Sequence, residues 1–148
     1  MADLDSPLIM KPGEGEQVTI GGASLRIIIP SIATDDAYSL HEIVLKRGAE
    51  IPETTLGWHR LLYWIVEGSF KFRVAARTAL VSPGAALSVP PGTAHSYQSI
   101  SDTGGRILVY ALPGGFDDYI RDMGAILAGS DQTTGVNELN IKYQISFR

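Results

Sequence analysis

Residues 84–99 read GAALSVPPGTAHSYQS: a turn, a short apolar segment, a Pro-Pro-Gly turn, and a second segment that begins with a histidine. Glycine and proline supply the backbone angles of turns, so the segments beside them predict two short β-strands. Alternate side chains of a strand share a face, which places His95, Tyr97 and Ser99 together. A histidine just after a rigid turn is held in a fixed position, as a metal ligand or a general base has to be.

The spacing of Gly84, Pro90, Gly92 and His95 resembles the second motif of the cupin superfamily. The histidine of that motif is a metal ligand in the family, so the resemblance implies this role for His95. The family usually has an asparagine where this chain has Ser99.

Short β-rich segments separated by Gly and Pro turns lie on both sides of the motif, at residues 18–20, 25–29, 38–45, 61–66, 70–75, 77–81 and 106–112. Short strands at regular spacing are typical of a β-sandwich or barrel. The fold class is therefore predicted to be all-β, and the resemblance specifies the cupin double-stranded β-helix, or jelly-roll barrel. The segment around Pro52 and Gly57 predicts a loop.

The pattern changes after Pro113, where apolar residues recur at helical spacing. This spacing predicts a C-terminal helix at about residues 116–128, and we expect its apolar stripe to pack on the outside of the barrel. Residues 130–135 predict a polar loop, and 136–148 a short helix followed by a terminal strand.

The length of 148 residues and the 45% hydrophobic content predict one cupin domain at 16–148 after an N-terminal arm at 1–15. The net charge of −4 makes a nucleic-acid partner unexpected, and the absence of Cys excludes disulfides and thiol catalysis. No signal-peptide or transmembrane pattern occurs, so a soluble cytoplasmic protein is expected. The resemblance, to small quercetin-dioxygenase-like cupins over about residues 15–128, implies a homodimer that exchanges residues 15–29.

The first motif of the cupin family is degenerate in this chain. Glu67-Gly68 resembles its end, and counting back places Thr54 and Leu56 at the two histidine positions. Leu61 or Leu62 falls at the glutamate position, and none of these residues is a good metal ligand. Absence of a cofactor is therefore the first expectation, and a divalent metal (Fe, Mn, Ni or Zn) held by His95, His59 and a third ligand is the alternative.

Strand alternation turns Leu61, Tyr63 and Ile65 toward one face, which the family register makes the interior. An aromatic-walled cavity with tyrosine hydroxyls would bind a small apolar or aromatic molecule. His41 is expected to be exposed at a strand edge, and it could supply the third metal ligand only if it faced inward. An inward Arg60 or Arg106 would hold a carboxylate or enolate oxygen. The candidate catalytic residues are His95, His59, Tyr63 and Tyr97; the candidate substrate-binding residues are Trp58, Arg60, Leu61, Ile65, Ser99, Arg106 and Tyr110.

Three functions remain open from the sequence. The first is an enzyme without a metal that isomerises or cyclises a small apolar substrate, with histidine and tyrosine as acid and base. The second is a metal-dependent cupin oxygenase or isomerase, and the third is a cupin that binds a small molecule without chemistry. No Walker-type phosphate loop and no Gly-X-Ser-X-Gly elbow occurs, so nucleotide hydrolysis and serine hydrolysis of that class are not expected.

Overall fold

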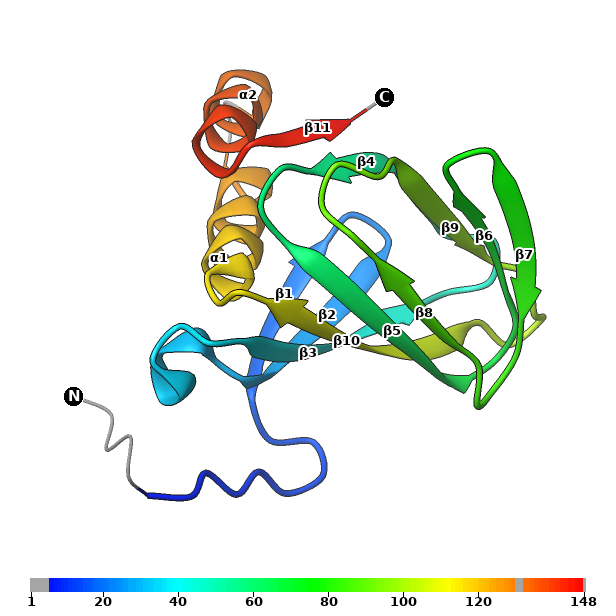
Figure 1. Cartoon of the computed structure of the whole chain (residues 1–148), viewed down its shortest axis with the longest axis horizontal. Coiled ribbons are helices and arrows are strands. Elements are labelled where there is room, and N and C mark those ends of the chain that lie inside the picture. Colours follow the sequence, from blue (N-terminus) through cyan, green and yellow to red (C-terminus); the bar gives the residue numbers. More distant parts are fainter. Residues whose placement is uncertain (1–5, 130–131, 148) are drawn as a thin grey trace.

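Two antiparallel β-sheets face each other in the computed structural model, which describes residues 6–129 and 132–147 (Figure 1). The six-stranded sheet has the order β1 (Glu16–Ile20), β2 (Ala23–Ile29), β3 (Ser39–Leu45), β10 (Gly105–Leu112), β5 (Arg60–Glu67) and β8 (Ala86–Val89). The five-stranded sheet has the order β11 (Ile145–Phe147), β4 (Glu50–Leu56), β9 (His95–Ser99), β6 (Phe70–Val74) and β7 (Arg77–Val81). The helical elements are η1 (Ser31–Thr34), α1 (Phe116–Leu127) and α2 (Gln132–Tyr143).

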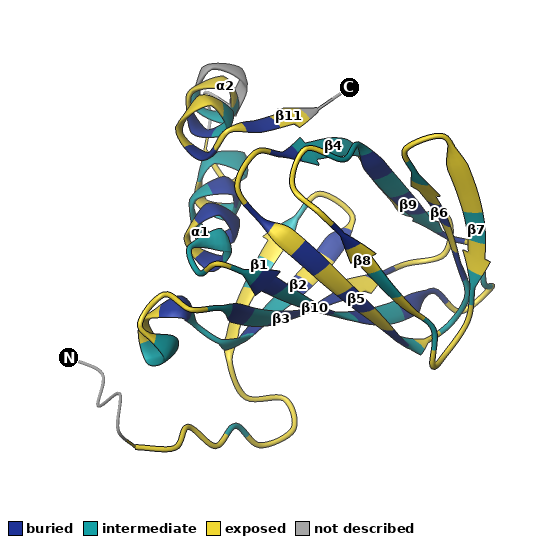
Figure 2. Cartoon of the chain, in the orientation of Figure 1, coloured by how far each residue is buried: buried dark blue, intermediate teal, exposed yellow. Residues whose placement is uncertain are grey.

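The core lies between the inner faces of the two sheets. In β5 the residues Leu61, Tyr63 and Ile65 are buried, while Leu62 and Trp64 point outward, as the alternation predicted. The same alternation is visible as buried and exposed steps along the strands in Figure 2.

The motif at residues 84–99 folds as its turn residues predict. Gly84 and Gly92 have positive φ angles of +94° and +81°, which residues with a Cβ rarely adopt. Strands β8 and β9 follow these turns, and they lie in different sheets. The motif therefore connects the two layers and presents His95 at the start of β9.

Two elements differ from the sequence prediction. The predicted loop around Pro52 is strand β4, whose pairing with β9 shifts register between Ile51 and Thr54. A proline is tolerated in a strand at such an irregularity, because no ladder hydrogen bond from its nitrogen is needed there. The predicted polar loop at 130–135 is replaced from Gln132 onward by α2, while residues 130 and 131 lie outside the described residues.

The prediction that helix α1 packs its apolar stripe on the outside of the barrel is wrong. Its apolar stripe, which includes Phe116, Tyr119 and Met123, faces a cavity between the sheets. Helix α1 also contacts the edge strand β1 and packs against α2 (Figure 1). The stripe therefore closes one end of the space between the sheets.

Part of the outer face of the six-stranded sheet is apolar. Leu62 and Trp64 of β5 and Leu108 and Tyr110 of β10 border a shallow groove there.

The expected homodimer stays a prediction: light scattering should give twice the chain mass of 15.9 kDa, and a monomer mass at every concentration would contradict it. Within the described residues no helix is long and apolar enough to cross a membrane.

Candidate functional site

His95 lies inside the barrel, with only 4% of its surface exposed. Its Nδ1 is 3.3 Å from the carbonyl oxygen of Thr93, in the turn that precedes β9. Because a carbonyl oxygen can only accept a hydrogen bond, this bond assigns the proton to Nδ1, and the lone pair of Nε2 can then accept a hydrogen bond. The prediction that the motif aims His95 inward is confirmed.

Tyr63 supplies the partner of His95. Its hydroxyl is 2.7 Å from Nε2 of His95 and donates to it. Tyr63 belongs to β5 of one sheet and His95 to β9 of the other, so the bond joins the two layers. Tyr97 packs edge-on against Tyr63, with ring centroids 5.4 Å apart.

Burial sets the protonation states of this pair. Burial lowers the pKa of His95, while the carbonyls of Thr93 and Thr54 favour the charged ring and oppose the shift. Burial also raises the pKa of the Tyr63 hydroxyl well above its usual value, and the neighbouring Tyr97 acts in the same direction. At neutral pH the pair is therefore a neutral imidazole that can accept a proton and a tyrosine that keeps its own.

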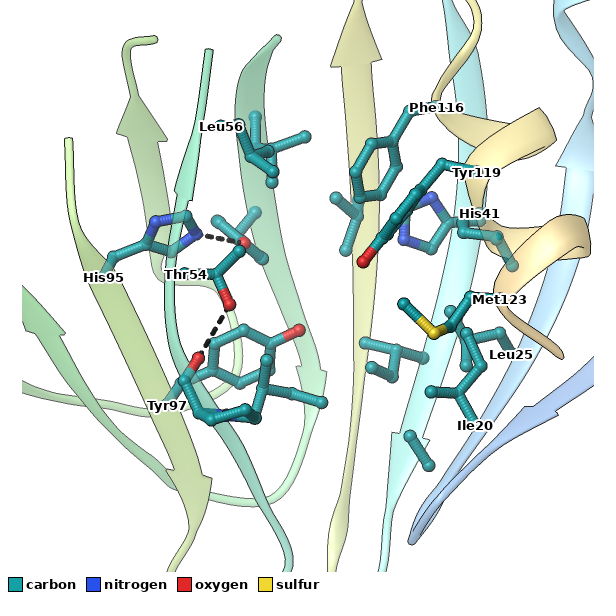
Figure 3. A pocket seen from close by; sticks show the side chains of 18 of the residues that line it. Ile20, Leu25, His41, Thr54, Leu56, His95, Tyr97, Phe116, Tyr119 and Met123 are labelled. Carbon is teal, nitrogen blue, oxygen red and sulfur yellow. Dashed lines mark hydrogen bonds between the residues drawn. The ribbon is translucent and has the colours of Figure 1, made fainter. Parts of the chain in front are cut away.

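A cavity of about 310 Å³ opens beside this pair. Figure 3 shows its two walls: His95 and Tyr97 project from one side, and His41, Phe116 and Met123 from the other. Six of its twenty lining residues have polar side chains, and these are His41, Thr54, Tyr63, His95, Tyr97 and Tyr119. No Asp, Glu, Lys or Arg among the described residues lines it, so the cavity suits a neutral and mainly apolar ligand.

His41 lies in the cavity wall and not at the surface, which corrects the expected exposed position. It is 3% exposed and stacks on Phe116, with centroids 5.6 Å apart. Burial lowers its pKa to about 4, although the nearby Asp117 acts in the opposite direction. His41 is thus a second neutral imidazole at this cavity.

The pKa of His41 predicts that acid destabilises the fold. The unfolded chain binds this proton near pH 6.5 and the folded chain only near pH 4, so protonation favours unfolding. Neutral His41 makes its full contribution to the free energy of unfolding above the pKa of the unfolded chain. About 3 kcal/mol of this free energy is lost as the pH falls to about 4. Urea unfolding measures the loss of the free energy of unfolding between about pH 7 and 4, and this loss should be about 3 kcal/mol smaller for the His41→Phe variant than for the wild type. Equal losses would contradict this prediction.

Comparison with known proteins gives the family of this barrel. The sequence model of the AraC-like ligand binding domain matches residues 48–136, more than half of the chain. The chain belongs to this family. It is also 25% identical over 118 residues to the quercetin 2,3-dioxygenase of Bacillus subtilis, in an alignment that covers 80% of this chain and 35% of that enzyme. The chain thus spans about a third of the length of that curated relative.

Solved structures show the same fold for this AraC-like domain. An RmlC-like cupin from Shewanella frigidimarina has a TM-score of 0.64 at 22% identity, covering 76% of this chain and 96% of that chain. The polyketide cyclase RemF from Streptomyces resistomycificus has a TM-score of 0.63 at 20% identity, covering 72% and 79%. The predicted cupin jelly-roll fold and the resemblance to a small cupin are confirmed.

The positions where cupins were expected to hold a metal do line the cavity of this AraC-like domain. Thr54 pairs with His95 in the β4–β9 register, and Leu56 and Leu61 are lining residues as well. Two of the three are hydrocarbons, and the Thr54 hydroxyl donates to the Pro52 carbonyl at 2.8 Å. Within the described ranges no group of three His, Cys, Asp or Glu could hold a metal ion, so a family-type metal centre does not fit these residues.

His59 does not join His95 in the cavity lining, which corrects its expected placement. It is 3% exposed, lies in the loop before β5, and donates from Nε2 to the Gly114 carbonyl at 3.3 Å. Its ring meets the edge of Phe116, with centroids 5.4 Å apart. His59 therefore supports Phe116, which in turn lines the cavity.

Several predicted substrate-binding residues lie elsewhere in this AraC-like domain. Trp58 is 48% exposed, Arg60 bonds to Ser88 on the surface at 3.3 Å, and Tyr110 borders the outer groove. Arg106 lies between Glu42 and Glu67, at 3.7 and 3.9 Å, on the outer face of its sheet. These four are corrections to the expected set, because alternation in β10 turns Arg106 and Tyr110 away from the core.

The remaining predicted residues divide between the cavity and the closed core. Leu61 lines the cavity together with the predicted catalytic residues His95, Tyr63 and Tyr97. Ile65 and Ser99 are buried but lie beyond the cavity lining. Among the lining residues that the sequence did not predict are His41 and the apolar stripe of α1, which was expected on the outside of the barrel.

Proposed function

We propose that this protein is an enzyme that binds a neutral, mainly apolar small molecule in the barrel cavity and isomerises or cyclises it without a metal ion. The observation that carries the proposal is the 2.7 Å hydrogen bond from Tyr63 to His95 beside a cavity without charged lining residues. A neutral histidine and a protonated tyrosine are a base and an acid held together. The low polarity around them strengthens any hydrogen bond that they make to a substrate.

The proposed chemistry begins with a carbonyl compound whose oxygen accepts a hydrogen bond from Tyr63. Nε2 of His95, released by Tyr63, takes a proton from the carbon beside the carbonyl and leaves an enolate. The carbonyls of Thr93 and Thr54 stabilise the charged imidazolium. The same proton then returns to another carbon, which gives an isomer, or to the oxygen formed when the enolate carbon attacks a second carbonyl, which gives a ring. Neither outcome consumes an oxidant or another reactant.

The similar structure named polyketide cyclase supports this reaction type by analogy only, since its 20% identity shows the fold alone. The apolar lining of the cavity disfavours ordered water, which limits random protonation of an enolate. Its apolar walls support binding of the substrate by burial of hydrocarbon surface.

The test is a mass-spectrometric screen of neutral apolar metabolites incubated with the wild-type protein. One compound is expected to be converted to a product of unchanged mass, or of that mass less one water where the hydroxyl formed on ring closure leaves together with a proton of the neighbouring carbon. No conversion is expected by the Tyr63→Phe, His95→Gln double variant. A product that contains added oxygen would contradict the proposal.

A second function is favoured by the family itself, which is described as a ligand-binding domain. In this alternative the chain binds the same class of molecule in the same cavity and releases it unchanged. The screen separates the two functions: a compound that copurifies with the protein and is returned unchanged after long incubation supports binding alone.

Metal analysis provides a separate prediction of the proposal. Purified protein is expected to contain less than about 0.1 equivalent of Fe, Mn, Ni, Zn or Cu, because the cavity offers two histidines, His41 and His95, on opposite walls (Figure 3), where a stable site needs three or four ligands. Elemental analysis by mass spectrometry measures this content. One equivalent of a single metal, retained through dialysis, would contradict the proposal and favour the oxygenase alternative.

A further inference from the structure

His41 is one of the polar residues of the cavity that take no part in the proposed chemistry. It lies on β3 of the six-stranded sheet, on the inward face that it shares with Ile43 and Leu45. Figure 3 shows it on the wall opposite His95. The two imidazoles therefore approach a bound molecule from different sides.

The other polar lining residues have partners within the protein. Tyr63 is bonded to His95, and the Thr54 hydroxyl donates to the Pro52 carbonyl. The Tyr119 hydroxyl donates to Oδ1 of Asn140 at 3.2 Å, and Tyr97 lies against Tyr63. His41, in contrast, has a buried Nδ1 without a hydrogen-bond partner among the described residues.

An unpaired buried nitrogen destabilises a fold by roughly 1–3 kcal/mol. Nδ1 of His59 is unpaired in the same way, but of the two histidines only His41 lines the cavity. Stacking on Phe116, with ring planes inclined by 28°, holds the imidazole at a defined angle to the cavity. Phe116 is in turn supported by His59. The ring is thus oriented by its surroundings, and its place in the cavity lining opposite His95 (Figure 3) points to a group of the ligand.

We infer that the ligand of this cavity is an uncharged molecule with an apolar body and two separated hydroxyl or carbonyl groups, one bound by Tyr63 and His95 and the other by His41. This inference rests on the proposed function and names its substrate class. Neutral histidine donates from one nitrogen and accepts at the other, so it serves a hydroxyl or a carbonyl. The volume of about 310 Å³ is at the small end for ligand sites, which suits a body of about two rings.

Three probes with the same body test this inference: biphenyl, p-phenylphenol and p,p′-biphenol, with no, one and two hydroxyl groups. Calorimetric titration of the wild-type protein is expected to show p,p′-biphenol binding about tenfold more tightly than p-phenylphenol. In the His41→Phe variant this advantage should disappear, while p-phenylphenol keeps its affinity within about threefold. Absence of binding by all three probes would overturn the inference.

The matched control is His59→Phe, which removes an equally buried histidine that also contacts Phe116 but does not line the cavity. This variant should keep the preference for p,p′-biphenol. An equal loss in both variants would overturn the inference, because it would show that the preference depends on the packing of Phe116.

A second measurement needs only the wild-type protein and covers the case of a variant that does not fold. In nitrogen NMR of histidine-labelled protein, p,p′-biphenol should shift the ring signals of His41 and His95 and leave those of His59 in place. An unmoved His41 signal at saturation would overturn the inference. If the preference for two hydroxyl groups holds but no substrate is ever converted, the proposed chemistry fails and the inference on ligand class stands.

Discussion

Turnover is expected to fall by about 10²–10⁴-fold when His95 is replaced by Gln, because the change removes the base that takes the substrate proton. Glutamine keeps a polar group near the Tyr63 hydroxyl, so the cavity and the fold should survive. The measurement is kcat/KM for the substrate found in the metabolite screen, together with the melting temperature of each variant.

The control for this prediction is His59→Gln. Both histidines were candidate catalytic residues from the sequence, and both are nearly fully buried. Only His95 lines the cavity, so the His59 variant is expected to stay within about threefold of wild type. Similar losses in the two variants, or full activity without His95, would show that the site has been assigned to the wrong imidazole.

The Asp117→Ala change is expected to destabilise the protein by about 3 kcal/mol. Asp117 accepts from the Ser31 amide at 3.0 Å, from the Ser31 hydroxyl, and from Nη1 of Arg121 at 3.0 Å. Burial alone would raise the pKa of this carboxyl, but the Ser31 bonds and Arg121 hold it below its usual value. The ionised group therefore fastens the first turn of α1 to η1, and its loss leaves buried donors unpaired.

Asp118→Ala is the matched control for Asp117→Ala. Its carboxylate binds the same Arg121 at 3.0 Å, but its side chain is 61% exposed. Exposed ion pairs contribute little, so this change should alter the free energy of unfolding by less than about 1 kcal/mol. Urea denaturation measures both values. Equal values would contradict the view that Asp117 anchors the helix that forms one cavity wall.

The turns and the strand alternation explain how much of the fold could be predicted from the sequence. Gly84 and Gly92 need positive φ angles for purely local reasons, so they could be placed in turns without knowledge of the tertiary structure. Alternation then turned Tyr63 and His95 inward, and their hydrogen bond follows from the facing of β5 and β9.

His41 and α1 could not be predicted in the same way, because their environment depends on contacts between distant segments. A histidine in a strand has the same local pattern whether its face meets solvent or a helix. One signal was available in Glu42, because a charged residue indicates the outer face of β3. His41 lies on the other face of this strand, together with Ile43 and Leu45. The helical stripe of α1 predicted a packed helix, but not that it would face a cavity.

Arg106 and Tyr110 show a different source of error. Both were predicted to bind substrate because of the chemistry of their side chains. Ile107 and Val109, which lie between them in the sequence, form the buried apolar face of β10. Because the alternation of a strand is strict, the burial of Ile107 and Val109 turns Arg106 and Tyr110 outward. In β10 the alternation of apolar and polar residues therefore predicts the position of a side chain better than the chemistry of that side chain does.

We propose that the Tyr63–His95 pair does its chemistry without a metal ion. This proposal is tested most directly by the rate of product formation by wild-type protein before and after dialysis against a chelator, with the metal content measured in both samples. We expect the same rate in both samples and no increase when Fe, Mn, Ni or Zn is added back. Loss of the rate on chelation, with recovery on addition of one of these metals, would contradict the proposal.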